Sequence, residues 1–464
     1  MTSSASTYDV AVIGAGLVGA AIARELSAYE LSVVWLEASD DVGNGTSKAN
    51  TAILHTGFDA TPGSLEGRLV PRGYELLSAY AAEAGIPVER TGAILVAWDD
   101  QQAAALPGIQ RKAQLNGYHA TELISAAAVY AAEPNLGAGA VAGLTVPDEA
   151  ITCTWTTNLA LATDAVRRGV DLRLEHSVLA VHVEADSTLV RTSCGDVRAR
   201  WVVNAAGLGS DLVDRMLGHD RFTITPRRGE LIVFDKQSRS LVSSIVLPVP
   251  TSLGKGVLVS PTVYGNVMVG PTAEDVEDRR DTSTTPSGLA MLVAAAQRLV
   301  PALAHEEVTS TYAGLRAATE HTDYVVEFSG AQRYVVAGGI RSTGLTACLA
   351  IAEHVVRLVR ESQLLTLVER PALPTTVRMP NLGEAYPRPY QDDDRIAADP
   401  DYGRIVCFCE RVSAGEIRDA LCSTVPARTL GGLRRRTRVL NGRCQGFFCG
   451  SEVAGLLDRG VGAP

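Results

Sequence analysis

The sequence lacks the long apolar segments of a membrane protein. No run of roughly 18 or more uncharged apolar residues occurs, so we expect no membrane-spanning helix. The opening segment, MTSSASTYDV, holds neither a basic stretch nor an apolar one, so we expect no signal peptide. Both absences point to a cytoplasmic protein, in which clustered cysteines bind metal more often than they form disulfides.

An excess of positive charge is also missing. The 464 residues carry 42 basic and 52 acidic side chains, a net charge of −10, so we expect no nucleic-acid binding. The charge is uneven, because residues 403–464 hold ten arginines and five acids, about +5, which leaves about −15 for the rest. The length, the 46% hydrophobic content and the 43 glycines favour two or three domains of the α/β class.

The N-terminal segment YDVAVIGAGLVGAAIARELSAYELSVVWLEAS predicts a strand, a turn, a helix and a second strand. Gly14, Gly16 and Gly19 have the spacing G-x-G-x-x-G, which allows a tight turn, a close approach to a pyrophosphate and close helix–strand packing. The following helix would aim its first N–H groups at the phosphates. Glu37 ends the second strand, where an acid binds ribose hydroxyls. The segment therefore predicts a dinucleotide site rather than a purely structural turn.

The choice between NAD and FAD depends on the rest of the chain. Glu37 is compatible with either cofactor, since both carry a free 2′-hydroxyl. A second short strand, 200–211, ends in Asn-Ala-Ala-Gly, and residues 333–359 predict a strand, a glycine-rich turn and a long helix with Arg341 and Gly344 near its start. Two nucleotide-type turns so far apart favour a two-part cofactor wrapped by the chain.

Several motifs carry a family resemblance. They are the glycine fingerprint at Gly14, SKANTAILHTGFDATPGSLEGRL, VVNAAGLGSD, TPRRGEL, VMVGPTAEDVEDR, YAGLRAATE and GGIRSTGLTA. Over about residues 8–360 the sequence resembles the FAD-dependent amino-acid-oxidase and glycerol-3-phosphate-dehydrogenase superfamily. Within it, the sequence is most similar to anaerobic-type glycerol-3-phosphate dehydrogenase A subunits and to L-2-hydroxyglutarate-oxidising relatives.

The resemblance implies an α/β fold, with a Rossmann-type FAD-binding domain (about 8–75, 145–225 and 325–370) and an inserted mixed-sheet substrate domain (about 76–144 and 226–324). It implies FAD as the cofactor, and because no cysteine or histidine is clearly placed for attachment, we expect the FAD not to be covalently bound. The cofactor-binding residues that it implies are Gly14, Gly16, Gly19, Glu37, Thr46, Ser47, Asn50, Ala206, Gly207, Gly339, Arg341, Ser342, Thr343, Gly344, Leu345 and Thr346.

Three side chains are candidates for contact with the substrate. His55 lies in the segment 46–59, which runs under the flavin in the family, and it is either a general base or a structural hydrogen-bonding residue. Arg316 is the first candidate for binding a carboxylate or phosphate, and Arg341 is the second. Arg227 and Arg228 are weaker candidates for the border of the pocket.

Two departures from the family concern this pocket. Many relatives have proline at the position of Ala317 and histidine at that of Tyr264, so the substrate can differ from glycerol 3-phosphate. We expect strands of the substrate-side sheet at residues 93–99, 231–235, 256–272 and 324–328.

After the helix at 333–359 the composition changes. Residues 371–402 hold six prolines and an aspartate run, which predicts an extended linker along the surface. A unit of about sixty residues then begins at 403. Within it, Ser413 and Glu416 form a capping-box pattern at the start of a short helix, and residues 429–440 predict the beginning of a second.

Four of the eight cysteines lie in this unit as C-x-C and C-x4-C: Cys407, Cys409, Cys444 and Cys449. Four thiolates can hold a structural zinc or a [2Fe–2S] cluster, and C-x-C is unusual for zinc. The pattern resembles the bacterioferritin-associated-ferredoxin-type [2Fe–2S] domain, which also ends anaerobic-type glycerol-3-phosphate dehydrogenase A subunits, and this resemblance favours the cluster. The cysteines outside the pattern are expected to be buried packing residues: Cys153, Cys194, Cys348 and Cys422.

Five arginines in this unit leave three interpretations open. Arg434, Arg435, Arg436, Arg438 and Arg443 could stabilise an anionic cluster, form a solvated helix face, or bind an acidic partner.

The sequence therefore predicts an FAD-dependent dehydrogenase that oxidises a small anionic alcohol, glycerol 3-phosphate or a 2-hydroxy acid, by hydride transfer to flavin N5. Its electrons would pass through a [2Fe–2S] cluster to a partner subunit or a quinone, and any membrane association would be peripheral and through a partner. The alternatives are an amine, opine or amino-acid dehydrogenase subunit, and an electron-transfer subunit without a substrate of its own. The expected compartment is the cytoplasm.

Overall fold

The computed structural model describes residues 7–250, 256–384 and 386–461. Its first sheet has a parallel core in the order β9-β2-β1-β12-β20. The glycine fingerprint follows the central strand β1, whose apolar residues from Val10 to Ile13 are buried. The core strands are β1 (Tyr8–Ile13), β2 (Val33–Leu36), β9 (Asp171–Arg173), β12 (Gly195–Asn204) and β20 (Tyr334–Gly338). Antiparallel strands extend it: β10 (Val178–Val183), β11 (Thr188–Thr192) and β19 (Val325–Ser329).

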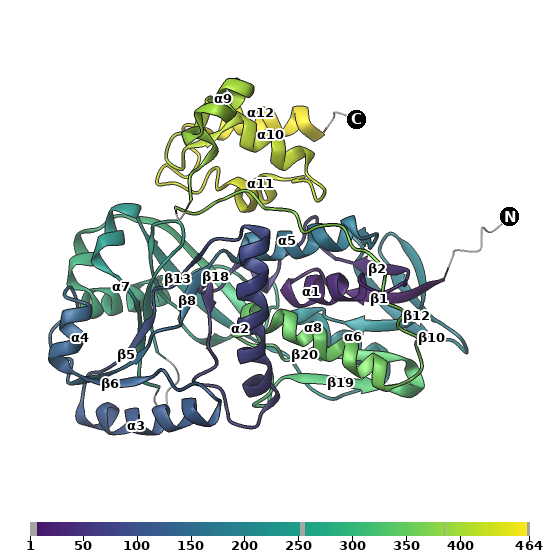
Figure 1. Ribbon diagram of the computed structural model, residues 1–464, viewed down its shortest axis with the longest axis horizontal. Coiled ribbons are helices and arrows are strands. Elements are labelled where there is room, and N and C mark those ends of the chain that lie inside the picture. Colours follow the sequence, from purple (N-terminus) through teal and green to yellow (C-terminus); the bar gives the residue numbers. More distant parts are fainter. Residues whose placement is uncertain (1–6, 251–255, 385, 462–464) are drawn as a thin grey trace.

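Helices cover one face of this sheet and build the larger hydrophobic core (Figure 1). They are α1 (Leu17–Leu26), α2 (Leu65–Ala84), α5 (Thr154–Arg167) and α8 (Gly344–Glu361). The other face packs against α6 (Ser210–Met216), in a second core that also includes residues of β10 and β11. We call this unit the parallel-sheet domain. Its crossover strands and glycine turn confirm the predicted α/β class.

The second sheet is mixed and has nine strands in the described part of the chain, in the order β17-β13-β16-β15-β14-β5-β7-β6, with β18 beside β13. The strands are β5 (Ala93–Ala97), β6 (Glu122–Ser125), β7 (Ala142–Val146), β13 (Thr225–Phe234), β14 (Ile245–Pro248), β15 (Leu258–Pro261), β16 (Val267–Gly270), β17 (Glu274–Asp275) and β18 (Val308–Ala318). We call this unit the mixed-sheet domain.

Side chains alternate across this second sheet, because successive residues of a strand point to opposite faces. Ile94 and Val96 pack with α4 (Ala126–Ala132) and α7 (Pro286–Leu299), while Leu95 packs with α3 (Asp100–Leu115). A small sheet links the two domains and contains β3 (Ile53–Leu54), β4 (Val88–Glu89) and β8 (Ala150–Thr152).

The strand expected at 324–328 belongs to the other sheet. It is β19, which pairs with β20 from Val325 opposite Gly338 to Ser329 opposite Tyr334. The assignment to the substrate-side sheet was therefore wrong, because a five-residue strand carries no signal for which sheet it joins.

The segment after α8 crosses both domains. Tyr29 forms a bridge with Glu369, Met379 donates to the carbonyl of Ala84 at 2.7 Å, and Glu384 donates to that of Val263 at 2.9 Å. The segment is not extended throughout, since Asp393–Ala398 forms the short helix α9. Asp392 caps this helix by accepting a hydrogen bond from the backbone of Arg395, so the acid run that suggested a linker starts a helix instead.

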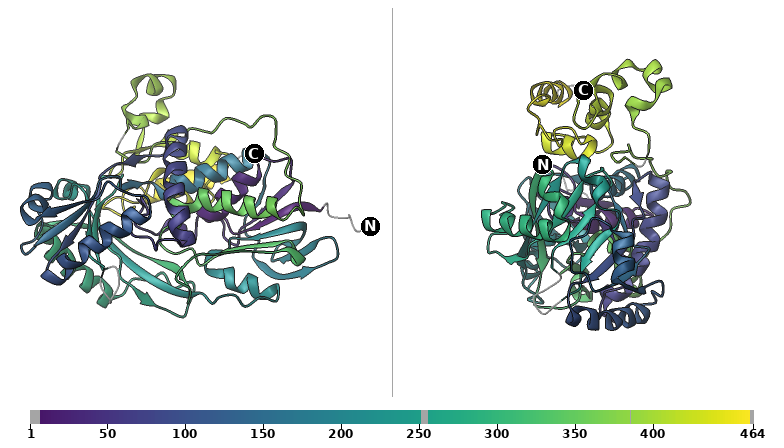
Figure 2. Two further views of the ribbon diagram at one scale, coloured as in Figure 1. Left: turned by 60° about the horizontal axis from the view of Figure 1, so that its bottom comes forward. Right: turned by 90° about the vertical axis from the view of Figure 1, so that its left-hand side faces the viewer.

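The C-terminal domain, residues 403–461, lies over the junction of the other two domains (Figures 1 and 2). It has its own core, which includes Val406, Ile417, Leu433 and Val453. Ser413 and Glu416 form the predicted capping box at the start of α10. The elements are β21 (Ile405–Cys407), β22 (Val412–Ser413), α10 (Ala414–Cys422), α11 (Leu430–Thr437) and α12 (Gly450–Val461).

The cysteines outside the C-x-C and C-x4-C pattern fall into two groups. Cys153 and Cys348 are buried, as expected, whereas Cys194 and Cys422 are exposed, which contradicts the prediction. Cys194 lies in the turn between β11 and β12, and Cys422 is the last residue of α10, so neither reaches a core. In the described ranges, no helix is long and apolar enough to cross a membrane.

Candidate cofactor and substrate site

The turn after β1 has a backbone that requires glycine. Gly14 has φ of +100°, and a Cβ atom on it would lie 2.4 Å from the carbonyl oxygen of Ala205. A Cβ atom on Gly19 would lie 1.9 Å from the carbonyl oxygen of Gly14, so α1 packs directly on the turn. Glu37 holds the turn from the neighbouring strand, because its carboxylate accepts a hydrogen bond from the backbone of Ala15 at 2.6 Å. Gly14, Gly19 and Glu37 therefore fix the backbone conformation of the turn after β1.

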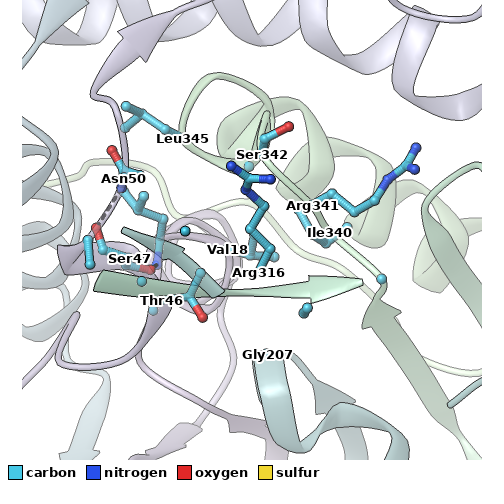
Figure 3. A pocket seen from close by; sticks show the side chains of 18 of the residues that line it. Val18, Thr46, Ser47, Asn50, Gly207, Arg316, Ile340, Arg341, Ser342 and Leu345 are labelled. Carbon is cyan, nitrogen blue, oxygen red and sulfur yellow. Dashed lines mark hydrogen bonds between the residues drawn. The ribbon is translucent and has the colours of Figure 1, made fainter. Parts of the chain in front are cut away.

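A cavity opens at this turn, where the parallel-sheet and mixed-sheet domains meet (Figure 3). Ten of the predicted cofactor-binding residues line it: Gly16, Thr46, Ser47, Asn50, Gly207, Gly339, Arg341, Ser342, Gly344 and Leu345. Strands β13 and β18 close the cavity with Gly229, Leu231, Gly314 and Arg316. The lining therefore comes from segments far apart in the chain, which suits a long cofactor.

Six predicted residues are not among the described residues that line the cavity: Gly14, Gly19, Glu37, Ala206, Thr343 and Thr346. The first three shape the turn. Thr343 donates to a carboxylate oxygen of Glu66 at 2.6 Å, and Thr346 accepts from the backbone N–H of His55 at 2.9 Å, so both hydroxyls point toward other elements.

The two candidate anion-binding arginines differ in their partners. The Arg341 guanidinium donates to the carbonyl of Thr322 and lies 3.6 Å from Glu66, and Figure 3 shows it directed away from Arg316. Arg316 lines the cavity and has no salt bridge to any residue in the described ranges. Burial, followed by the nearby charge of Arg227, lowers the pKa of Arg316, which indicates a cation without a compensating acid. Arg316 is thus the better anchor for an anionic ligand.

Arg227 and Arg228 do not border this cavity. Arg227 makes two hydrogen bonds to Asp275, at 2.6 and 2.9 Å, and Arg228 pairs with Glu274 at 2.6 Å and Asp281 at 2.9 Å. Both cations are compensated, so they fix the β13–β17 edge.

His55 is paired with a buried acid that the sequence did not reveal. Its Nδ1 lies 2.9 Å from Oε2 of Glu149, which is completely buried. The other carboxylate oxygen accepts hydrogen bonds from the backbone N–H and the hydroxyl of Thr56, at 2.7 and 3.0 Å. A carboxylate at Nδ1 favours the tautomer that leaves the lone pair on Nε2. Glu149 lies 94 residues away in the chain, and no local pattern marks it.

The four cysteines of the C-terminal domain meet as two pairs of thiols. Cys409 contacts Cys444, and Cys407 contacts Cys449. Burial raises the pKa of Cys449 to about 12, whereas backbone N–H groups, mainly that of Phe448, lower the pKa of Cys444. Among described residues, no three His, Cys, Asp or Glu side chains are grouped closely enough to hold a single metal ion. Two pairs of sulfurs match the four-thiolate requirement of a two-iron cluster.

Three phenylalanines adjacent to these cysteines are exposed. Phe408 lies between Cys407 and Cys409 and is 76% exposed, while Phe447 and Phe448 precede Cys449 and are 85% and 77% exposed. Apolar side chains on a surface of this kind usually mark a contact with another molecule.

The arginine block has a role outside the three interpretations left open by the sequence. Arg435 and Arg436 bind Asp41 of the parallel-sheet domain at 2.6 and 2.7 Å, and Arg443 binds Asp235 of the mixed-sheet domain at 2.7 Å. Together these ion pairs attach the C-terminal domain to both other domains.

Sequence and structure comparisons agree with this geometry. Residues 9–358 match the model of the FAD dependent oxidoreductase family, and residues 405–459 match that of the BFD-like [2Fe-2S] binding domain. The chain has the fold and the glycine turn of a dinucleotide-binding flavoprotein. It belongs to the FAD dependent oxidoreductase family and carries a C-terminal [2Fe–2S] domain, as predicted.

Individual relatives extend this assignment. The chain is 35% identical over 456 residues to a glycerol 3-phosphate dehydrogenase of Caloramator mitchellensis, covering 98% of this chain and 95% of the relative. It is 30% identical to a glycerol 3-phosphate oxidase of Mycoplasma pneumoniae, covering 76% of this chain and 94% of the oxidase. A solved structure of L-alpha-glycerophosphate oxidase from that organism, with FAD bound, superimposes with a TM-score of 0.76 at 28% identity and covers 81% of this chain and all of that one. The protein is an FAD-dependent oxidoreductase of the dehydrogenase type.

Proposed function

We propose that this protein oxidises a small anionic alcohol, glycerol 3-phosphate or a 2-hydroxy acid, and delivers the electrons through its C-terminal domain to a partner protein or a quinone. The observation that carries the proposal is Arg316, a cation without a salt bridge in the described ranges. It lies on the wall of the cavity at the glycine turn, which we call the FAD cavity. The names of the relatives support the substrate class, since they act on glycerol 3-phosphate.

When bound, FAD supplies a two-electron acceptor and the [2Fe–2S] cluster a one-electron carrier. Arg316 holds the anionic end of the substrate by charge-assisted hydrogen bonds. His55 is not among the described residues that line the cavity; its proposed role is to take the proton of the reacting hydroxyl, with the buried Glu149 carboxylate at Nδ1 stabilising the imidazolium that results. The residues proposed to ligate the cluster are Cys407, Cys409, Cys444 and Cys449.

The exposed aromatic rings support the last step. Phe408, Phe447 and Phe448 surround the cysteine loops with apolar surface that a partner can cover. A cluster whose purpose is one-electron delivery also fits a protein or quinone acceptor better than molecular oxygen.

The test is anaerobic mixing of the purified holoprotein with one compound at a time: glycerol 3-phosphate, L-2-hydroxyglutarate and a set of amino acids. We expect an anionic alcohol to bleach the flavin absorbance near roughly 450 nm. Bleaching by amino acids alone would favour an amino-acid dehydrogenase, and bleaching by none of them would favour an electron-transfer subunit.

A further inference from the structure

A second, larger cavity lies between the C-terminal domain and the other two domains. Its volume is about 770 Å³, within the range of pockets that enclose an organic ligand. The parallel-sheet domain contributes residues from Lys48 to Ala52, strands β15, β16 and β18 contribute one wall, and α11 of the C-terminal domain contributes another. The cavity shares Ala49, Asn50 and Thr51 with the FAD cavity, but Arg316 and Arg341 do not line it.

The charge of this lining has one sign. Four cations, Lys48, Arg434, Arg435 and Arg438, line the cavity, and none of the described lining residues is an aspartate or a glutamate. This composition contrasts with the chain as a whole, whose net charge is −10. A cleft lined by several cations and no acid attracts anions, because field lines concentrate between its low-dielectric walls.

Two of the four cations are compensated outside the lining. Arg435 binds Asp41 at 2.6 Å, and Arg438 binds Glu410 at 2.7 Å and stacks on the ring of Tyr264 at 3.9 Å. These pairs hold α11 in place and leave little net charge for a ligand.

The other two cations form no salt bridge among the described residues, although the charge of Asp40 acts on Lys48 from outside the lining. Lys48 donates only to the neutral amide oxygen of Asn44, at 2.8 Å, among described residues. Arg434 has no salt bridge in the described ranges, and its Nε is buried without a hydrogen-bond partner. A buried guanidinium donor without an acceptor costs free energy unless a ligand satisfies it. Burial, and then the charge of Arg435, lowers the pKa of Lys48, and the opposing effect of Asp40 is smaller.

The remaining lining suits the uncharged part of an organic anion. Hydroxyl side chains are abundant: Thr152, Thr154, Thr262, Thr282, Ser283, Thr284, Thr309, Ser310 and Thr311. Trp155 and Tyr264 stack at 5.5 Å between ring centroids and provide an apolar surface.

We propose that this cavity is a second ligand site, distinct from the FAD cavity, that binds a hydroxylated organic anion with a phosphate or carboxylate group between Lys48 and Arg434. Because Lys48 belongs to the parallel-sheet domain and Arg434 to the C-terminal domain, the ligand bridges the two. Binding therefore strengthens the docking of the [2Fe–2S] domain.

The experiment measures binding of two redox-inactive probes, inorganic phosphate and citrate, to the oxidised full-length holoprotein. Trp155 is the reporter because it lines the cavity, whereas Trp35 and Trp201 are fully buried and Trp98 is not among the lining residues. A Trp155→Phe variant identifies the fluorescence change that belongs to it. All titrations use an Arg316→Gln background, which removes the proposed anion anchor of the FAD cavity. Redox-inactive probes keep this test independent of the proposed oxidation.

We expect saturable quenching by at least one probe, and an increase of about tenfold in its Kd on adding Arg434→Gln or Lys48→Gln. Arg434→Lys keeps the charge and should lose less affinity, and the matched control Arg428→Gln, an exposed arginine of the same domain, should not change the Kd. Tighter phosphate than citrate binding would identify a phosphate site, and the reverse order a carboxylate site. Absence of saturable binding, or a Kd that both Arg434→Gln and Lys48→Gln leave unchanged, would overturn the proposal.

Discussion

The FAD cavity and the cysteine loops differ in how the chain assembles them. Residues that line the FAD cavity range from Gly16 to Leu345 and come from both large domains, so the cavity exists only when distant segments have found one another. The four cysteines lie between positions 407 and 449, in a domain with its own hydrophobic core. One site is thus a product of long-range topology and the other of a short segment. A substitution at one site should therefore abolish cofactor binding there without affecting cofactor binding at the other.

The largest effect is expected from the cysteines. Cys449→Ser should reduce the iron content from about two per chain to nearly none, because a [2Fe–2S] cluster requires four ligands. The flavin content should remain, since the FAD cavity contains no residue of the C-terminal domain. Iron analysis and the absorption spectrum measure both. Cys422→Ser, at an exposed cysteine off the pattern, is the control, and retention of two irons in Cys449→Ser would contradict the ligand assignment.

The converse substitution is Gly19→Ala. Its Cβ would meet the carbonyl oxygen of Gly14 at 1.9 Å, so α1 must shift away from the turn that we propose binds the pyrophosphate. We expect purified protein with little FAD and a normal iron content, measured by the flavin-to-protein ratio and iron analysis. Gly45→Ala is the control, because nothing lies within 4 Å of its added Cβ. Loss of iron together with FAD would show that the two sites depend on each other.

The same contrast explains what the sequence could predict. The sequence could predict features that depend on a few neighbouring residues. These are the glycine turn, the α/β class, the capping box and the spacing of the cysteines. Those patterns predicted a dinucleotide site and a four-thiolate site. The family resemblance favoured FAD and the [2Fe–2S] cluster, and the family comparisons confirm both.

The sequence could not predict features that depend on tertiary contacts. Glu149 lies far from His55 in the chain, and the arginines of α11 carry no mark of their partner Asp41. Local composition likewise gave no sign that Cys194 and Cys422 are exposed. Side-chain partners are fixed by the packed structure, so a motif indicates a residue's position better than its role.

Within the FAD region, Glu149→Gln tests the positioning of His55. Gln cannot stabilise an imidazolium, so we expect kcat to fall by about 100-fold with little change in KM, and the pH dependence of kcat to move. If Glu149 had only a structural role, Glu149→Gln would change protein yield and thermal stability but would not lower kcat while leaving KM nearly unchanged. Asp148→Asn, which alters the adjacent carboxylate bound by Tyr118, is the matched control.

Arg316 and Arg341 give the next contrast. Arg316→Gln should raise KM for an anionic alcohol by roughly 30-fold, the value of a lost charge-assisted hydrogen bond. Arg341→Gln should change KM less than about threefold, because Glu66 and the carbonyl of Thr322 already engage its guanidinium. Steady-state reduction of an artificial acceptor measures both variants. A larger effect at Arg341 would reverse the assignment of the anion anchor.

The smallest effect concerns the contact between the two regions. Burial alone would raise the pKa of Asp41, but hydrogen bonds and charges from Arg436 and Arg435 outweigh it and lower the pKa. A carboxyl with a lowered folded-state pKa contributes stability above its unfolded value of about 4, and this contribution is lost as the pH falls through the folded value. Asp41→Asn should therefore increase amide hydrogen exchange in α11 several-fold at pH 7, after correction for intrinsic exchange.

The difference between this variant and the wild type should shrink as the pH falls below about 4, because the wild-type carboxyl then becomes neutral as well. Asp40→Asn is the matched control, since Asp40 accepts a hydrogen bond from Asn44 instead of binding α11. Equal exchange in Asp41→Asn and the wild type at pH 7 would mean that the ion pair contributes little to docking. Docking would then depend on other contacts, among them the ion pairs of Arg443 with Asp235 and of Glu410 with Lys236 in the mixed-sheet domain.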